Sequence, residues 1–226
     1  NGKTTTATVL YQLFSSLGYT CGLISTIECR IGEAILPASH TTPDPKQLHR
    51  LFRDMRKAGC SHVFMEVSSH GLHQQRVAGI PFRCAIFTNL THDHLDYHGT
   101  FQNYLEAKKL LFDGLNHNAF AIINIDDKHA DIMVQNCKAD IVSYSLQTYA
   151  DFRGKILENQ VNGLLMDIDG TEIWFRLRGE FNAYNLLACL AAAVSLGEEK
   201  DDVLFHLSNV TGAAGRMEVY QFEEGW

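Results

Sequence analysis

The first residues of the chain are of the types that bind phosphate groups. The run Asn-Gly-Lys-Thr-Thr-Thr occupies positions 1–6. Gly2 lets the backbone approach an oxyanion, Lys3 supplies a positive charge, and Thr4 offers a hydroxyl to Mg²⁺. The complete phosphate-loop pattern includes a glycine further upstream. We therefore expect residues to precede Asn1 in a longer polypeptide.

Glu66 is the first candidate partner for this loop. It ends an apolar run that reads as a strand, residues 61–67. A carboxylate placed there, opposite a phosphate loop, can hold Mg²⁺. The alternative is a strand-end glutamate in water. A polar turn follows at residues 67–71, Val-Ser-Ser-His-Gly, where a sheet presents its ligands.

Residues 91–99 form the densest cluster of possible metal ligands, Thr-His-Asp-His-Leu-Asp-Tyr-His-Gly. The order His-x-His-x-Asp resembles the zinc motif of metallo-β-lactamase-fold hydrolases, which would be a different reaction class. That motif has a histidine directly after the aspartate, where this chain has Tyr97. It also requires an αββα sandwich of antiparallel sheets, so this alternative is disfavoured.

Lys108 lies on the apolar side of a helix expected over residues 101–112, whereas Lys109 falls on its polar side. Such a lysine usually extends its ammonium into water. Near metal ions, however, the pKa of a lysine can fall far enough for the neutral amine to react with CO₂. The resulting carbamate could help to hold a second Mg²⁺.

Threonine hydroxyls and a few other polar groups complete the candidates, each with a simpler alternative. Thr41 and Thr42 precede a helix expected from Asp44, where they could cap the helix or bind an anion. Gln74 and Arg76 could bind an acidic ligand or form a solvated surface pair.

Two asparagines and one arginine near the end of the chain could contact a nucleotide. Asn182 and Asn185 open a helix, and they could contact a base edge or merely cap that helix. Arg216 follows the glycine-rich linker at residues 212–215, where it could reach phosphates or lie exposed without a partner.

Helical and strand periodicities alternate along most of the chain. A helix after residue 4 ends at Gly18, and further helices are expected at 44–58, 101–112, 128–137, 182–196 and 201–207. Strands are expected at 20–26, 61–67, 82–88, 119–124 and 141–144. This order predicts an α/β fold with a mostly parallel sheet and helices on both faces. From residue 152 to 177 the period is two, which predicts antiparallel strands at a sheet edge, with turns at Asn162-Gly163 and Asp169-Gly170.

Composition restricts the function classes. Nineteen basic and 26 acidic residues give a net charge of −7 with no basic run, which argues against nucleic acid or an anionic membrane as the main partner. No apolar run approaches the ~20 residues of a membrane span. Six scattered cysteines predict buried free thiols in a reducing cytoplasm.

Several of these motifs coincide in order and spacing with the central ATPase domain of the Mur ligases, which the chain resembles over nearly its whole length. The matching runs are Asn-Gly-Lys-Thr-Thr-Thr at 1–6, Thr-Thr-Pro-Asp at 41–44, Met-Glu-Val-Ser-Ser-His-Gly-Leu at 65–72, Thr-Asn-Leu-Thr-His-Asp-His-Leu-Asp-Tyr-His-Gly at 88–99, Glu-Ala-Lys at 106–108, Phe-Asn-x-x-Asn at 181–185 and Gly-Arg-Met-Glu at 215–218. The polar turn at residues 67–71 and the histidine-containing cluster at residues 91–99 resemble the corresponding segments of the family member that adds the third residue of the peptidoglycan stem peptide.

The resemblance implies a role for each matching residue. Nucleotide contacts would come from Asn1, Gly2, Lys3, Thr4, Thr5, Asn185 and Arg216. Two Mg²⁺ ions would be held by Thr4, Glu66, His94 and Lys108 as its carbamate, and Lys3, His94 and Lys108 would serve catalysis. The substrate would be bound by Thr41, Thr42, Ser68, Gln74 and Arg76. His40 stands where some relatives have asparagine, so its role stays open.

The resemblance also implies the reaction and the organisation of the chain. The enzyme would be a cytoplasmic, monomeric, ATP-dependent amide ligase acting on UDP-MurNAc-L-Ala-D-Glu and an amino acid, diaminopimelate or L-lysine. It would work without nucleic acid or membrane insertion. Residues 1–214 would form the central ATP-binding domain and residues 215–226 the start of the next. Two alternatives remain on the same loop: a kinase or simple NTPase, and a nucleotide-binding module without catalysis.

Overall fold

The computed structural model describes residues 1–38, 40–91, 95–213 and 215, and it shows an α/β fold built on two sheets. The smaller sheet has the strand order β3-β2-β1-β4. Its strands are β1 (Cys21–Ile24), β2 (Glu28–Ile31), β3 (Ala34–Pro37) and β4 (His62–Met65). Strands β1 and β4 are parallel, whereas β2 and β3 form an antiparallel hairpin beside β1. This hairpin is absent from the sequence expectations.

The larger sheet has the strand order β10-β9-β8-β7-β6-β5. Its strands are β5 (Cys84–Phe87), β6 (Phe120–Asn124), β7 (Asp140–Ser145), β8 (Phe152–Gln160), β9 (Gly163–Ile168) and β10 (Thr171–Phe175). Strands β5 to β8 run parallel and β8 to β10 antiparallel, so the expected parallel sheet with an antiparallel edge is confirmed.

Of the two expected hairpin turns, one is in place and one is displaced. Asp169 and Gly170 join β9 to β10, and both have positive φ, 52° and 87°, as this tight turn requires. The sequence places the other turn at Asn162-Gly163. Gly163 instead pairs with Gln160 as the first residue of β9, so Val161 and Asn162 form the turn.

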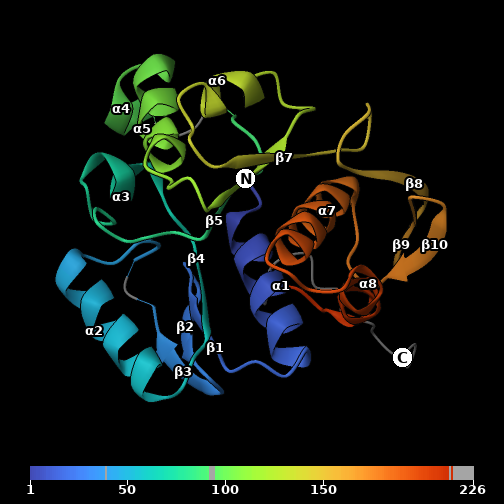
Figure 1. Ribbon diagram of the computed structural model, residues 1–226, viewed down its shortest axis with the longest axis horizontal. Helices are drawn as coiled ribbons and strands as arrows, with labels where there is room; N and C mark the ends of the chain where they lie inside the picture. Colours follow the sequence, from blue (N-terminus) through green and yellow to red (C-terminus); the bar gives the residue numbers. More distant parts are fainter. Residues whose placement is uncertain (39, 92–94, 214, 216–226) are drawn as a thin grey trace, which may run out of the picture.

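Helices cover both faces of the sheets (Figure 1). They are α1 (Lys3–Ser16), α2 (Pro45–Lys57), α3 (Ser69–His73), α4 (Leu95–His98), α5 (Phe101–Asp113), α6 (Ala130–Val134), α7 (Glu180–Ser195) and α8 (Lys200–Asn209). Helix α1 packs against β1 and β4 and also against α7, which lies on β6, β7 and β8. Helices α5 and α6 cover the opposite face of β5 and β6, and α2 and α3 share a separate core with β1.

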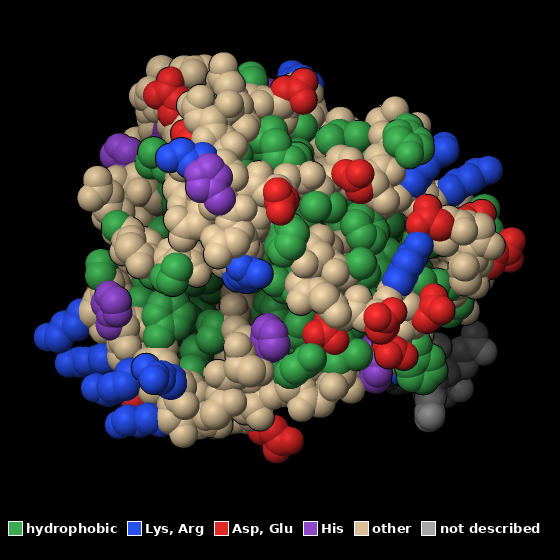
Figure 2. All heavy atoms as spheres, viewed as in Figure 1, with side chains coloured by type: hydrophobic (Ala, Val, Ile, Leu, Met, Phe, Trp, Pro, Cys, Tyr) green, Lys and Arg blue, Asp and Glu red, His purple; other side chains and the backbone are tan. Residues whose placement is uncertain are grey.

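Helix α2 illustrates how local sequence sets an element. Asp44 accepts a hydrogen bond from the Gln47 amide at 3.0 Å, and Pro45 occupies the first turn, so Asp44 is the N-cap. Leu48 and Met55 are buried against the small sheet. Lysine and arginine side chains cover the outer face, as Figure 2 shows at the lower left.

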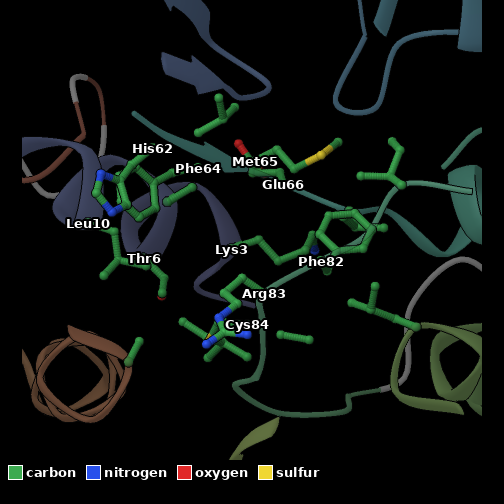
Figure 3. Close-up of a pocket in the computed structure, with 18 of the residues that line it drawn as sticks. Lys3, Thr6, Leu10, His62, Phe64, Met65, Glu66, Phe82, Arg83 and Cys84 are labelled. Carbon is green, nitrogen blue, oxygen red and sulfur yellow. The ribbon is translucent and has the colours of Figure 1, made fainter. Parts of the chain in front are cut away.

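A groove of about 550 Å³ separates β4 from β5 (Figure 3). These are the end strands of the two sheets, so neither has a hydrogen-bonded neighbour on the groove side among the described residues. The walls are mainly apolar and include Phe52, Phe64, Phe82 and Ile86, while Lys3, Glu66 and Thr88 are among the polar residues. Two strand edges thus face one another across an apolar space.

The cysteines are free thiols, as expected, but only three of them are fully buried. All six cysteines are free. Cys21, Cys29 and Cys189 are buried and the other three are half-buried. Burial raises the pKa of the Cys84 thiol to about 12, which keeps it protonated. Among the described residues, none of the helices combines the length and apolar character needed to cross a bilayer.

Leu187 of α7 provides a test of how the larger sheet is held. Its side chain is fully buried, and a Cβ added at Gly154 of β8 would lie only 3.1 Å from its methyl carbons. We expect Leu187→Ala to lower the free energy of unfolding by about 2–5 kcal/mol, because it leaves a cavity between helix and sheet. Urea unfolding would measure this. Leu110→Ala, at a position 51% exposed on α5, is the control and should change it little. Equal losses would contradict this packing.

Candidate nucleotide and metal site

The beginning of α1 has the geometry of an anion site. Gly2 precedes the helix with φ 84°, and no side chain caps the helix. The first helical N–H groups therefore lack intrahelical partners and carry the positive end of the helix dipole. A Cβ at Gly2 would lie 2.5 Å from Asn185 Oδ1, so both the backbone angle and the close approach require glycine here.

Glu66 lies at the carboxyl end of β4, directly beside this helix end. Its side chain is buried, the residue being 2% exposed. Oε2 accepts hydrogen bonds from the hydroxyls of Thr4 and Thr26, both at 3.1 Å, and Oε1 accepts one from the Thr26 amide at 2.7 Å. The simple alternative of a solvated glutamate is therefore wrong. Thr26 is absent from the sequence-based candidates, although it ends the expected strand 20–26.

These oxygens suit a hard divalent cation. Mg²⁺ prefers carboxylate and hydroxyl oxygens and usually retains water ligands. The Glu66 carboxylate accepts three hydrogen bonds and offers roughly four lone-pair sites, so one site remains for a cation. The donor set of Thr4 and Glu66 thus fits Mg²⁺.

Asn1 links the phosphate loop to the end of β5. Thr88 donates its hydroxyl to the Asn1 carbonyl at 2.7 Å, and the main-chain nitrogen of Asn1 donates to Asn89 Oδ1 at 2.9 Å. The loop therefore lies between the carboxyl ends of β4 and β5.

A second cavity, of about 530 Å³, opens beside Asn1 and Gly2. Its other lining residues are Asn89, Asn124, Asp126, Asp127, Phe181, Tyr184 and Asn185. Sequence reasoning missed Asn124, Asp126 and Asp127. Asn124 ends the strand expected at 119–124, and Asp126 and Asp127 follow it, so the strand-end rule that selected Glu66 would have selected them too. Asp126 and Asp127 are held by backbone amides, Leu146 N at 2.8 Å and Leu90 N at 2.7 Å respectively.

Asn182 and Asn185 lie in the first turns of α7 but do not cap it, since the N-cap is Gly179. Both are buried and bonded in series. Asn185 Nδ2 donates to Asn182 Oδ1 at 2.9 Å, and Asn182 Nδ2 donates to the Arg178 carbonyl at 2.7 Å. Asn185 Oδ1 also accepts from the Thr6 hydroxyl at 3.3 Å. Asn185 thus fixes one wall of the cavity against α1.

Lys3 extends along the groove between β4 and β5 towards Phe82 (Figure 3). It does not line the cavity beside Gly2. Thr5 is buried in the first turn of α1. Contacts of Lys3 and Thr5 with a nucleotide therefore stay predictions.

Thr42 connects Glu66 with the polar turn at residues 67–71. Its hydroxyl donates to the Glu66 carbonyl at 3.1 Å and accepts from the Ser68 amide at 3.0 Å. The Ser68 hydroxyl accepts from the Gly71 amide at 3.0 Å as the N-cap of α3. Thr41 is bonded to the Thr26 hydroxyl at 3.1 Å, and His40 is exposed. Thr41, Thr42 and Ser68 are therefore brought together beside Glu66.

Arg76 and Gln74 lie close to this group. Arg76 donates Nη1 to the Thr42 carbonyl at 2.7 Å, and it donates Nε and Nη2 to Gln74 Oε1 at 2.9 and 2.6 Å. The two side chains form a pair, as the alternative of a solvated surface pair requires. That pair is tied to Thr42 rather than solvated on all sides.

Lys108 and Lys109 differ from the sequence expectation in one respect. Lys108 is half-buried, with Nζ 5.1 Å from the centre of the Tyr104 ring. Lys109, assigned to the polar face, is instead 8% exposed and pairs with Asp113 at 2.5 Å. Its ion pair satisfies the charge, so the aliphatic stem can be buried.

Two predicted site residues, His94 and Arg216, lie outside the described residues, as do His92 and Asp93. In the part of the chain that the structure describes, no three His, Cys, Asp or Glu side chains gather as a metal cluster. The zinc-hydrolase alternative required a sandwich of antiparallel sheets. Strands β5 to β8 are parallel, so the fold disfavours that alternative.

Solved structures share this fold. One described as a UDP-N-acetylmuramoyl-L-alanyl-D-glutamate--2,6-diaminopimelate ligase superposes with a TM-score of 0.87 at 34% identity, covering 99% of this chain and 47% of that one. A MurF structure from Acinetobacter baumannii superposes with a TM-score of 0.79 at 19% identity, covering 99% and 47%, which shows likeness of fold alone.

Curated relatives match closely but are longer. Proteins named UDP-N-acetylmuramoyl-L-alanyl-D-glutamate--2,6-diaminopimelate ligase are 56% identical in Cytophaga hutchinsonii, covering 96% of this chain, and 50% identical in Parabacteroides distasonis, covering all of it. The chain spans about half of their length, 45% and 46%. Residues 1–193 match the Mur ligase middle domain. The chain therefore belongs to the Mur ligase family.

Proposed function

We propose that the chain is the ATP-binding part of an amide ligase that adds diaminopimelate to UDP-MurNAc-L-Ala-D-Glu in the cytoplasm. The observation that carries the proposal is the contact of Thr4 with buried Glu66 at the uncapped end of α1. It combines an anion site with a cation site, which is the arrangement that a nucleoside triphosphate with Mg²⁺ requires. The names of the relatives supply the substrates.

ATP would bind with its phosphates at the N–H groups that begin α1. Lys3 and a first Mg²⁺ on Thr4 and Glu66 would neutralise the γ-phosphate, with Arg216 closing on it. The cavity beside Gly2 and Asn185 has the volume and polar lining for the remainder of the nucleotide. A second Mg²⁺ would be held by Glu66, His94 and a carbamate on Lys108.

The substrate would be held by Thr41, Thr42, Ser68, Gln74 and Arg76. The first three lie beside Glu66, and Arg76, paired with Gln74, is hydrogen-bonded to the Thr42 carbonyl. Arg76 can present a planar pair of N–H groups to a carboxylate or a phosphate. Its ties to Thr42 and Gln74 orient it before any ligand binds.

In the reaction, the D-Glu side-chain carboxylate attacks the γ-phosphorus of ATP, which releases ADP and leaves an acyl phosphate. The amine of the incoming amino acid then attacks the acyl carbon, and phosphate leaves. Two anions must meet in the first step, so positioning and charge neutralisation are the main contributions of the protein.

We further propose that the chain is the central part of a longer polypeptide, with residues 215–226 leading into the next domain. The groove supports this. The carboxyl ends of β4 and β5 both meet the loop at residues 1–6: Thr4 donates to Glu66 after β4, and Thr88 after β5 donates to the Asn1 carbonyl. A further apolar strand, parallel to both and leading into Asn1, would satisfy the two free edges and fill the space.

Glu66→Gln tests the metal site. The amide keeps the shape but loses the charge, so we expect ligation by the longer enzyme to fall about 100-fold or more, with substrate binding little changed. Amide product and ADP are measured together, and Glu172→Gln on the exposed edge of β10 is the control. ADP release in the wild-type enzyme that does not depend on the amino acid would instead favour a simple NTPase, and unchanged activity in Glu66→Gln would rule out the metal role.

Lys108→Ala tests the carbamate. We expect ligation to fall between about 10- and 100-fold and to recover when a small carboxylate such as acetate replaces the missing carbamate. Lys109→Ala removes a neighbouring lysine whose ion pair with Asp113 is structural, so it should lower stability without any rescue by acetate. Wild-type activity in Lys108→Ala would contradict the carbamate.

A longer form of the chain tests the groove. We expect residues 1–226 preceded by their natural upstream segment to show slower amide hydrogen exchange in β4 and β5 than residues 1–226 alone. Strands β1 and β6, paired on both sides, are the internal control. Calorimetry should show tighter ATP binding by the longer form. Identical exchange at β4 and β5 in the two forms would refute the added strand.

A further inference from the structure

Tyr97 of α4 contacts the end of α3 through its hydroxyl group. Its oxygen lies 3.0 Å from Gln74 Nε2 and 3.0 Å from His73 Nδ1. Helix α4 lies near α3 and packs on α5 (Figure 1). Tyr97 thus joins α4 to the end of α3, about 23 residues away in the sequence. Of these two segments, the end of α3 leads into the proposed substrate ligands Gln74 and Arg76.

The chemistry of the partners sets the direction of each hydrogen bond. Arg76 can only donate, and two of its N–H groups point at Gln74 Oε1. The Gln74 amide must therefore turn its oxygen towards Arg76 and its NH₂ towards Tyr97. The phenol oxygen accepts from that NH₂, which leaves the phenol hydrogen for His73 Nδ1. Without the Tyr97 oxygen, nothing among these contacts holds the far end of the amide.

Gln74 in turn fixes the face that Arg76 presents. A guanidinium has five N–H groups. The described residues take three of them, two through Gln74 and one through the Thr42 carbonyl. One N–H on each terminal nitrogen is left, and each can donate to an oxygen of an oxyanion. Rotation of the Gln74 amide would release one edge of the guanidinium and lose this orientation.

We infer that Tyr97 is a positioning residue for the substrate: through Gln74 it orients the Arg76 guanidinium towards a carboxylate or phosphate of the ligand. The inference rests on the proposed substrate role of Arg76. It deepens that role by naming the group that pre-orients the arginine. Pre-orientation strengthens binding because less side-chain freedom is lost when the ligand arrives.

The competing explanation is that Tyr97 serves only to pack its ring against its neighbours. The ring contacts and the hydrogen bonds of the hydroxyl can be tested separately. The Tyr97 ring lies among three imidazoles, with centre distances of 4.0 Å to His70, 4.8 Å to His98 and 5.6 Å to His73. A phenylalanine keeps all of these ring contacts. Tyr97→Phe therefore removes the proposed hydrogen bonds and leaves the packing in place.

The test is steady-state kinetics of Tyr97→Phe in the longer ligase, with UDP-MurNAc-L-Ala-D-Glu varied at saturating ATP and amino acid. We expect KM for this substrate to rise about 3- to 10-fold, the loss of one to two hydrogen bonds, with kcat and the melting temperature nearly unchanged. Tyr149→Phe, at a tyrosine 87% exposed, is the matched control and should change neither. An unchanged KM in Tyr97→Phe overturns the inference.

A double-mutant cycle separates failure of this inference from failure of the proposed function. We expect Arg76→Ala to raise KM more than Tyr97→Phe, and the double variant to be no worse than Arg76→Ala, because Tyr97 acts through Arg76. Additive effects would show that Tyr97 acts by another route and overturn the inference. An unchanged KM in Arg76→Ala would reject the substrate role of Arg76 itself. Arg76→Lys, which keeps the charge but not the planar fork, replaces Arg76→Ala if that variant does not fold.

Discussion

The buried carboxylate of Glu66 is the constraint on which the arrangement of the site depends. A carboxylate removed from water is costly unless hydrogen bonds and a cation compensate it. Glu66 receives three hydrogen bonds, from Thr4 on α1 and from Thr26 after β1. These bonds draw the beginning of α1 and the ends of β1 and β4 to one point. The carboxylate that we propose to hold a cation therefore also fixes the position of the helix end that we propose to bind phosphate.

The two sheets contribute separate halves around that point. The smaller sheet supplies Glu66 and, through the loop before α2, Thr42. The larger sheet supplies Thr88 at the end of β5, and Asn124 with the aspartates that follow β6. Parallel strands end at the same edge, and this is why polar residues far apart in sequence meet here. The loop at Asn1 lies between the halves and is bonded to both.

The parts of the fold and of the candidate site that follow local sequence rules could be predicted from the sequence. Helical periodicity predicted α1 and α7, the change of period predicted the antiparallel edge from β8 to β10, and a carboxylate ending an apolar strand predicted Glu66. Other features depend on tertiary contacts that no local pattern records. Lys109 reads as a solvent-facing residue, yet its pairing with Asp113 allows burial. In the β2–β3 hairpin, residues 28–37, apolar and polar residues alternate only weakly, and each strand has only four residues. The pairing of the hairpin with β1 therefore decides its structure.

Thr42 connects the two parts of the site through hydrogen bonds that only the structure reveals. The Thr42 hydroxyl bonds the backbone on both sides of Val67, and the Thr42 carbonyl accepts from Arg76. Thr42 is 1% exposed, and a Cβ at Gly71 would lie 2.8 Å from its methyl carbon, so it cannot shift without moving α3. The separation between the proposed metal carboxylate and the proposed substrate guanidinium is therefore set by one threonine. In the proposed reaction an anion must approach the phosphate of ATP. A fixed separation between the proposed cation site and the proposed anion-binding arginine would then itself contribute to catalysis.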